Sequence, residues 1–404
     1  MKREKNKPKL WTKDFIIISL TNFFVHVVFY LLMATVAIYV MSEYQASSGM
    51  AGLTVGVYVI SALVARVFAG KYLDRIGRKR ALIGSFVIFT ISMLLHFGEN
   101  SLIVLFIIRF IQGAAHGFLT TAAGAVAADI IPNERRGEGT GYYATSMNLA
   151  MAIGPFLGIY LSGYADFQMI ILVGSIIAII GFVSSLFLQV PKVEDSEEQV
   201  HKISRFNVRH YIELKAVPIS VLLFLVTFAY SSLLAFLSLY AEDIQLVEVA
   251  SFFFIVYAAS LIVSRPITGK WFDKYGENRV TYPLLLCMAI GLFLLSQAHN
   301  GFLFLLSAVF IGIGYGTVQS NFLAIAIKQS PPNRTALATS TFFIFLDLGS
   351  GLGPYLLGIV VGMMGFRHLY FTAAIWILAC IGIYYFVHGK KAAAERKDMI
   401  RHSA

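Results

Sequence analysis

Long apolar runs alternate with short polar spacers along the whole chain. Each run holds about 20 residues or more, which is enough for a helix to cross the ~30 Å hydrocarbon core of a bilayer. The pattern predicts two sets of six membrane helices. The first set covers 14–40, 49–71, 80–97, 101–129, 138–163 and 168–190, and the second covers 216–241, 248–270, 279–297, 301–329, 336–363 and 368–389. The expected fold class is therefore an all-α polytopic membrane protein.

The composition indicates that little of the chain lies outside the bilayer. Of the 404 residues, 58% are hydrophobic and 13% are charged, whereas soluble domains carry about 25% charged residues. The two cysteines, Cys287 and Cys380, both fall in apolar runs, so neither a disulfide framework nor a cysteine metal site is indicated. We expect no metal ion and no cofactor.

The positions of the charges predict the orientation of the chain. The net charge is +10, which in a soluble protein would suggest a nucleic-acid partner. Here, however, all but four of the 32 Lys and Arg residues lie in alternate spacers, and the exceptions are Arg66, Arg109, Arg265 and Arg367. This asymmetry follows the positive-inside rule and places both termini in the cytoplasm. The opposite spacers carry acids such as Glu43 and Glu99. We therefore expect no nucleic-acid binding.

A charged turn between the second and third predicted helices recurs 199 positions later. Arg66, Gly70, Lys71, Asp74, Gly77 and Arg80 match Arg265, Gly269, Lys270, Asp273, Gly276 and Arg279 in register. A loop repeated at a fixed offset indicates a duplicated bundle. The predicted domains are 1–190 and 216–404, the second with a basic tail, joined by a polar cytoplasmic linker at 191–215. Whether Tyr211–Lys215 forms a surface helix or belongs to a solvated tether stays open.

The spans, the linker and the repeated loop together resemble the Major Facilitator Superfamily, whose fold is two pseudo-symmetric six-helix bundles. The most specific part is Gly70-Lys-Tyr-Leu-Asp74-Arg-Ile-Gly77-Arg-Lys-Arg80, which is similar to the family's helix 2–3 signature. The resemblance implies a conformational latch made of Gly70, Asp74, Arg75, Gly77, Arg78 and Asp129. In it, Asp74 would cap a helix of the other half, and Arg78 would pair with Asp129 to hold the outward-facing state. The alternative is that these charges only fix the topology.

One difference between the halves changes this expectation. In the second copy of the loop, Glu277 and Asn278 replace Arg78 and Lys79, so a weaker second latch is expected.

The fifth helix resembles an antiporter signature through Gly141, Gly154, Pro155 and Gly158, although Ala150 and Ile159 replace two of its glycines. Gly353 and Pro354 repeat Gly154 and Pro155, and both pairs are predicted to allow close helix crossing and bending. The match favours an exporter.

Charged and titratable residues inside the spans are candidates for proton coupling, because charge in hydrocarbon is costly. Asp347 is the predicted coupling acid. Arg109 opens Arg109-Phe-Ile-Gln112-Gly113, which resembles a helix 4 signature of proton-coupled facilitators, and its permanent charge would act on a nearby acid or hold an anionic group. His26 and His116 complete the set, since histidine titrates near neutrality. For each residue a purely structural, hydrogen-bonding role is the alternative.

Polar and aromatic residues inside the spans predict a substrate cavity. Asn22, His26 and Tyr30 are spaced by four residues and share one helix stripe. The predicted cavity set is Asn22, His26, Tyr30, Gln112, His116, Asn148, Tyr230, Tyr315, Gln319 and Asn321. Asn148 is the partner of Asp347 under the repeat. Aromatic residues make up 14% of the chain, which suits an apolar and adaptable cavity.

These features predict a transporter of the cell membrane and not an enzyme. We expect it to export lipophilic or amphipathic small molecules in exchange for protons, as a monomer in the lipid bilayer that works by alternating access. No Gly-x-x-x-x-Gly-Lys-Ser/Thr loop is present, so a proton gradient rather than ATP would supply the energy. One alternative is an exporter or importer of a single polar metabolite, such as a sugar or a metal-chelating molecule. Another is a polytopic membrane enzyme or sensor, against which the chain has no His-Glu-x-x-His motif.

Overall fold

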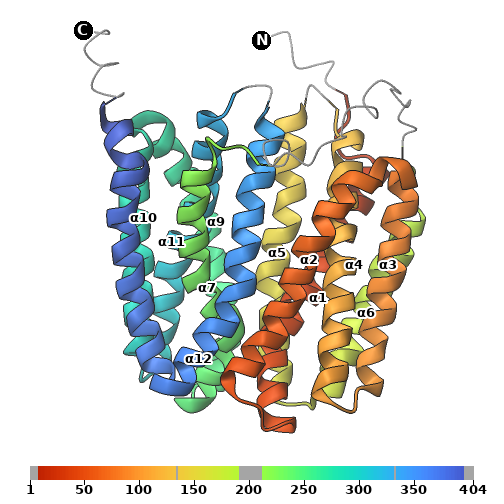
Figure 1. Cartoon of the computed structure of the whole chain (residues 1–404), viewed down its shortest axis with the longest axis horizontal. Coiled ribbons are helices and arrows are strands. Elements are labelled where there is room, and N and C mark those ends of the chain that lie inside the picture. Colours follow the sequence, from red (N-terminus) through yellow and green to blue (C-terminus); the bar gives the residue numbers. More distant parts are fainter. Residues whose placement is uncertain (1–7, 133–134, 191–211, 332–333, 395–404) are drawn as a thin grey trace. The chain divides into compact units, whose positions relative to one another are not determined.

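The computed structural model describes residues 8–132, 135–190, 212–331 and 334–394 of the chain (Figure 1). The described residues are helical almost throughout and contain no β-strand. Lipid offers no partners to backbone N–H and C=O groups, so an apolar segment that crosses it must satisfy these groups within its own helix. The apolar runs of the sequence therefore become helices.

The first half of the chain forms six long helices. They are α1 (Lys13–Glu43), α2 (Ser48–Ile76), α3 (Arg78–Leu95), α4 (Leu102–Ile130), α5 (Arg136–Ser162) and α6 (Phe167–Leu186), and the 3₁₀ turn η1 (His96–Gly98) follows α3. Side chains of Thr12, Ser101 and Asp166 cap the first turns of α1, α4 and α6 by accepting hydrogen bonds from backbone N–H groups. The predicted spans agree with these helices to within a few residues.

The second half repeats the arrangement with local differences. Its elements are α7 (Val217–Asp243), α8 (Val247–Ala250), α9 (Phe253–Tyr275), α10 (Glu277–Ser296), α11 (Gly301–Gln329), α12 (Thr335–Tyr384) and the π-helix η6 (Tyr385–Gly389). The predicted span 248–270 begins with the separate one-turn helix α8. At the end of the predicted linker, residues 214–216 form a turn rather than a helix.

α12 is two helical segments joined at Gly365. This glycine has φ 78°, in the left-handed region that glycine adopts without steric cost. An unbroken helix of 50 residues would be about 75 Å long, more than twice the hydrocarbon thickness. In the described residues, eleven segments are long and apolar enough to cross a membrane, and the last of them runs from Leu337 to Ala394. Its division at Gly365 is consistent with twelve crossings, and the predicted fold class is confirmed.

The helices group into two units. Unit 1 comprises Met1–Ala46 and Val57–Ser196, and unit 2 comprises Ser47–Gly56 and Glu197–Ala404. The first turns of α2 belong to unit 2 because they lie against α12, where Ser48 Oγ donates a hydrogen bond of 2.6 Å to Gly358 O. Residues 191–211, most of the predicted linker, lie outside the described residues.

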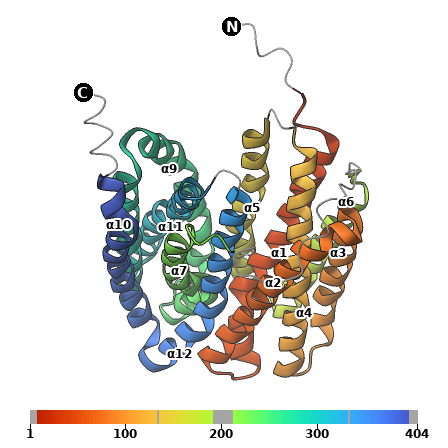
Figure 2. The ribbon, with the colours of Figure 1, turned by 45° about the horizontal axis from the view of Figure 1, so that its top comes forward.

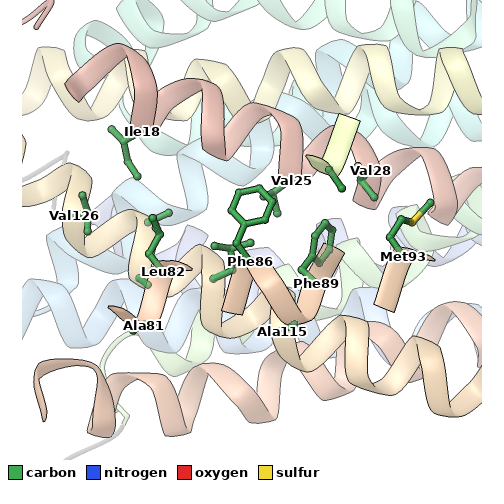
Figure 3. Close-up of a cluster of buried hydrophobic side chains, with 14 of the residues drawn as sticks. Ile18, Val25, Val28, Ala81, Leu82, Phe86, Phe89, Met93, Ala115 and Val126 are labelled. Carbon is green, nitrogen blue, oxygen red and sulfur yellow. The ribbon is translucent and has the colours of Figure 1, made fainter. Parts of the chain in front are cut away.

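The core of unit 1 lies between α1, α3 and α4. Figure 3 shows Ile18, Val25 and Val28 of α1 facing Leu82, Phe86, Phe89 and Met93 of α3, with Ala115 and Val126 of α4 beside them. Lipid tails are as apolar as these side chains, so the cluster is held by van der Waals packing rather than by exclusion from water.

Glycines mark the closest helix crossings in both units. A Cβ added at Gly154 of α5 would lie 2.6 Å from Tyr30 Cβ of α1, and one at Gly353 of α12 would lie 2.0 Å from Ser231 Oγ of α7. Pro155 and Pro354 follow inside the same helices. In unit 2, α7 packs on both α12 and α11 (Figure 2). Each unit therefore uses its glycine-proline segment to bring two helices close together.

Candidate functional site

Unit 1 contains two buried histidines near the middle of its helices. His26 of α1 and His116 of α4 are both buried, with ring centroids 5.3 Å apart. His26 Nδ1 donates a hydrogen bond of 2.8 Å to the main-chain oxygen of Asn22. The donor role fixes the proton on Nδ1 and leaves Nε2 as the acceptor of the neutral ring. His116 Nδ1 is buried without a hydrogen-bond partner in the described part of the chain.

Aromatic rings enclose this histidine pair. Phe29 of α1 stacks on Tyr58 of α2 at 5.3 Å and on His116 at 5.1 Å, measured between ring centroids. Tyr58 lies 5.5 Å from His116. Sequence reasoning missed Tyr58 because it is one of 20 tyrosines and stands in an apolar run with no distinguishing motif. The histidines therefore lie in a setting that excludes water.

Arg109 is wholly buried, with 0% of its surface exposed. Its Nη1 donates to Gln112 Oε1 at 3.0 Å, and its Cζ lies 4.3 Å from the centroid of the Tyr58 ring, a cation–π contact. By helix rise Arg109 lies about 10 Å from the start of α4. It therefore occupies the first half of the helix, and His116 occupies the centre. Arg109 and His116 are seven residues apart and share one face of α4.

The polar stripe of α1 connects to α5. Asn22 Nδ2 donates to Ser146 Oγ at 2.8 Å, and Ser146 Oγ donates to the main-chain oxygen of Tyr143 at 2.6 Å. Tyr30 is buried on the same stripe, 6.4 Å from His26 between ring centroids. The structure thus brings Asn22, His26, Tyr30, His116, Arg109 and Gln112 into unit 1, and the side chain of Asn148 lies outside the described residues.

Unit 2 contains an acid beside a cluster of tyrosines. Asp347 of α12 is 8% exposed and lies about 18 Å along the helix from Thr335. It lies within electrostatic range of the hydroxyl of Tyr315 of α11. The Tyr315 ring stacks face to face on Tyr230 of α7, with centroids 3.6 Å apart and planes 9° apart. Such rings offer apolar faces and polar tips in one place.

Further contacts define the tyrosine cluster. Tyr257 of α9, which sequence reasoning did not single out, lies 6.0 Å from Tyr230 between ring centroids, and the hydroxyls of Thr227 and Tyr315 are 3.3 Å apart. Gln319 is half-buried one turn beyond Tyr315. Asn321 is buried but stands six residues from Tyr315, on another face of α11. The structure therefore groups Tyr230, Tyr315 and Asp347, and it separates Asn321 from them.

The predicted latch is described in part. The Arg78 guanidinium, at the start of α3, contacts the carboxylate of Asp129 in the last turn of α4. Gly77 precedes Arg78 with φ 87°, so the turn requires glycine. The surroundings of Gly70, Asp74 and Arg75 lie outside the described residues.

Comparisons with known proteins give one consistent result. The sequence matches the Major Facilitator Superfamily over residues 18–354 and again over residues 286–401. It is 26% identical over 362 residues to Multidrug resistance protein 2 of Bacillus subtilis (strain 168), covering 86% of this chain and 89% of the relative. It is 22% identical over 348 residues to the Staphylopine export protein of Staphylococcus aureus (strain Mu50 / ATCC 700699), covering 82% and 86%.

Solved structures show the same fold. A bacterial homologue of the human lysosomal transporter Spinster, in an inward-facing and unoccupied conformation, aligns with a TM-score of 0.77 at 12% identity over 95% of this chain and 98% of that chain. The nucleoside transporter NupG aligns with a TM-score of 0.73 at 13% identity over 92% and 98%. At these identities the likeness establishes the fold alone.

Proposed function

Because this chain belongs to the Major Facilitator Superfamily, we propose that it exports lipophilic or amphipathic small molecules in exchange for protons, by alternating access. The observation that carries the proposal is Asp347, a carboxyl group buried near the middle of a membrane helix and close to Tyr315, whose ring stacks on Tyr230. Ionisable groups at this depth are costly and mark proton or substrate pathways. The likeness to Multidrug resistance protein 2 supports export of this substrate class.

Asp347 and the tyrosines would serve proton and substrate at one place. The carboxyl group binds a proton while its surroundings open outward and releases it when they open inward. The stacked rings of Tyr230 and Tyr315 offer an apolar surface whose binding depends on shape more than on fixed hydrogen bonds. A substrate on these rings changes the surroundings of Asp347, so substrate binding and proton binding would be linked.

The buried histidines His26 and His116 of unit 1, together with Arg109, would supply the second part of the coupling. His26 presents Nε2 as an acceptor, since its Nδ1 is held by the Asn22 carbonyl. Arg109 is fixed by Gln112 and by the Tyr58 ring, so its charge stays in one place on the face of α4 that carries His116. We assign Arg109 a positioning role, because its guanidinium does not release its own proton.

A transporter of one polar metabolite is the second candidate. The fixed polar contacts of Asn22 with Ser146 and of Arg109 with Gln112 favour it, as does the likeness to a protein named for export of a single compound. Competition experiments separate the two candidates. If several unrelated lipophilic compounds inhibit one another's efflux, the multidrug function is supported. If the protein carries one polar compound alone, the multidrug function is rejected.

The proposal is tested with inverted membrane vesicles. Asp347→Asn cannot cycle a proton, so we expect it to abolish accumulation driven by a pH gradient and to preserve downhill substrate exchange. Asp166→Asn is the matched control, because Asp166 lies at the N-cap of α6, where asparagine caps equally well. Gradient-driven accumulation by Asp347→Asn at the wild-type level would show that this carboxyl group is not the coupling acid.

A further inference from the structure

Unit 2 contains a charge-reversed copy of the Arg78–Asp129 ion pair. Under the 199-residue offset, Arg78 corresponds to Glu277 and Asp129 corresponds to Lys328. Lys328 Nζ lies 2.5 Å from Glu277 Oε1. The local geometry is also repeated: Glu277 opens α10 directly after Gly276, whose φ is 80°, as Arg78 opens α3 after Gly77. Sequence reasoning treated Glu277 as a lost arginine because it considered one member of the pair without the other.

Reversal of both charges preserves the attraction and improves its setting. Coulomb attraction is unchanged when both signs are exchanged. A carboxylate at the start of α10 and an ammonium in the last turn of α11 also match the helix dipoles, whereas Arg78 and Asp129 oppose those of α3 and α4. Both repeats therefore carry an ion pair at these two positions, with opposite polarity.

The copy in unit 2 has a third member, His388. Its Nε2 contacts the other carboxylate oxygen of Glu277, and its Nδ1 lies 2.6 Å from Gln329 Nε2. Glu277 and His388 are 6% and 5% exposed. His388 lies in the π-helix η6, a rare form that occurs often at functional sites.

Two neutral contacts fasten the same end of α12. Asn278 Nδ2 donates to the main-chain oxygen of Gly389 at 2.7 Å, and the Tyr384 hydroxyl donates to Asn278 Oδ1 at 2.8 Å. The end of α12 and the π-turn are thus held by α10 through both residues that differ from the first repeat, Glu277 and Asn278.

The hydrogen-bond pattern around His388 suits two protonation states. In the neutral ring, Nε2–H donates to Glu277 and Nδ1 accepts from the Gln329 amide. In the protonated ring both nitrogens donate, and Gln329 can turn its amide oxygen toward Nδ1. The charged and titratable groups that contact the ring in the described residues are Glu277 from α10 and Tyr384 from its own element, with Lys328 of α11 on the other oxygen of Glu277 and Tyr282 of α10 against Tyr384. Glu277 is the acid among them, so protonation places an imidazolium directly against a carboxylate.

We propose that Glu277, Lys328 and His388 form a second latch that responds to pH. Protonation of His388 adds a charge attraction to Glu277 and tightens the hold on the end of α12. This end faces the cytoplasm, a placement that rests on the proposed function. Acidification of the cytoplasm by proton entry would then slow the conformational cycle and limit further entry.

The first test measures thermal unfolding of the purified protein in detergent between pH 8 and pH 5.5. Wild type is expected to gain stability toward acid relative to His388→Gln, which retains a hydrogen-bonding side chain but cannot become charged. His368→Gln is the control, since His368 is exposed at the other end of the second α12 segment. A constant difference between wild type and His388→Gln over this range would overturn the proposal.

The second test exchanges the charges of the pair. Glu277→Arg and Lys328→Asp each place like charges together, and we expect each to reduce downhill substrate exchange, measured at equal pH on both sides, at least fivefold. The double variant copies the Arg78–Asp129 polarity and is expected to recover at least half of the exchange. It should not regain the stabilisation by acid, because His388 then faces an arginine.

The outcomes separate the latch from the proposed function. A double variant that folds but exchanges substrate no faster than the single variants would reject the pairing. The unfolding experiment does not depend on proton coupling. Acid-dependent stabilisation that requires His388 would therefore support the latch even if gradient-driven export by wild type were absent, and that absence would reject the proposed function alone.

Discussion

At the scale of single residues, Glu99 differs from what its sequence context predicts. It follows η1 in the spacer between α3 and α4, where an exposed acid is expected, yet both of its carboxylate oxygens are buried. Burial raises the pKa of the Glu99 carboxyl, and the Tyr39 hydroxyl and the Arg109 charge counteract this in part. A raised pKa in the folded state means that ionised Glu99 costs stability as the pH rises above the unfolded value. The ionised form of Glu99 therefore lowers the stability of the folded protein.

We therefore expect Glu99→Gln to raise the unfolding midpoint above that of wild type at pH 8. The difference should shrink toward pH 4, where the wild-type carboxyl is protonated and resembles the amide. Unfolding in detergent as a function of pH measures this, with Glu242→Gln as the control because Glu242 is exposed at the end of α7, away from Glu99 in the chain and not among the charges that act on it. A variant less stable than wild type at pH 8 would contradict the assignment.

At the scale of elements, close helix crossings depend on glycine at specific positions. Gly353 of α12 meets Ser231 and the main chain of α7, whereas a Cβ at Gly382, in the same element, would meet nothing within 4 Å. We expect Gly353→Ala to destabilise the protein by about 1–3 kcal/mol through overpacking. Gly382→Ala is expected to be neutral or slightly stabilising, because alanine favours helix.

Thermal unfolding and downhill exchange of the two alanine variants measure the contrast. Gly154→Ala should resemble Gly353→Ala, since its Cβ would meet Tyr30 and the main chain of α1. If Gly353→Ala and Gly382→Ala behaved alike, the crossing of α12 on α7 would be looser than the structure shows.

At the scale of the whole molecule, the Arg78–Asp129 pair and the Glu277–Lys328–His388 cluster offer a comparison between the repeats. The side chains of Arg78 and Asp129 are 24% and 19% exposed, whereas those of Glu277 and His388 are each 6% exposed. Asp129→Asn removes the partner charge of Arg78, and we expect it to slow transport at least fivefold while substrate binding persists. The combined change Arg78→Glu with Asp129→Lys should restore most of the rate.

Transport and equilibrium binding of the same substrate, measured on each variant, check this expectation. Arg80→Gln is a suitable control, because Arg80 is an exposed cation in the same first turn of α3. If Asp129→Asn transports at the wild-type rate, the latch is rejected, and the charges of this loop only set the topology.

The sequence by itself determined the spans, the duplication and the fold class. Each membrane helix makes its backbone hydrogen bonds within itself. An apolar run such as 301–329 therefore predicts its helix, Gly301–Gln329, whatever the neighbouring helices are. The fixed offset of 199 positions likewise indicates the duplicated bundle from the sequence alone. The positions of Asp347 and Arg109 inside the spans were visible for the same reason.

Only the tertiary structure decided which residues meet. Glu277 and His388 are 111 positions apart, and Arg109 rests on Tyr58 from another helix. The helices are apolar around most of their circumference, so the sequence pattern does not reveal which face turns inward. Tyr58, the burial of Glu99 and the three-membered latch therefore could not be read from the chain. They depend on how each helix is rotated against its neighbours, and that rotation is set by contacts between segments distant in the sequence.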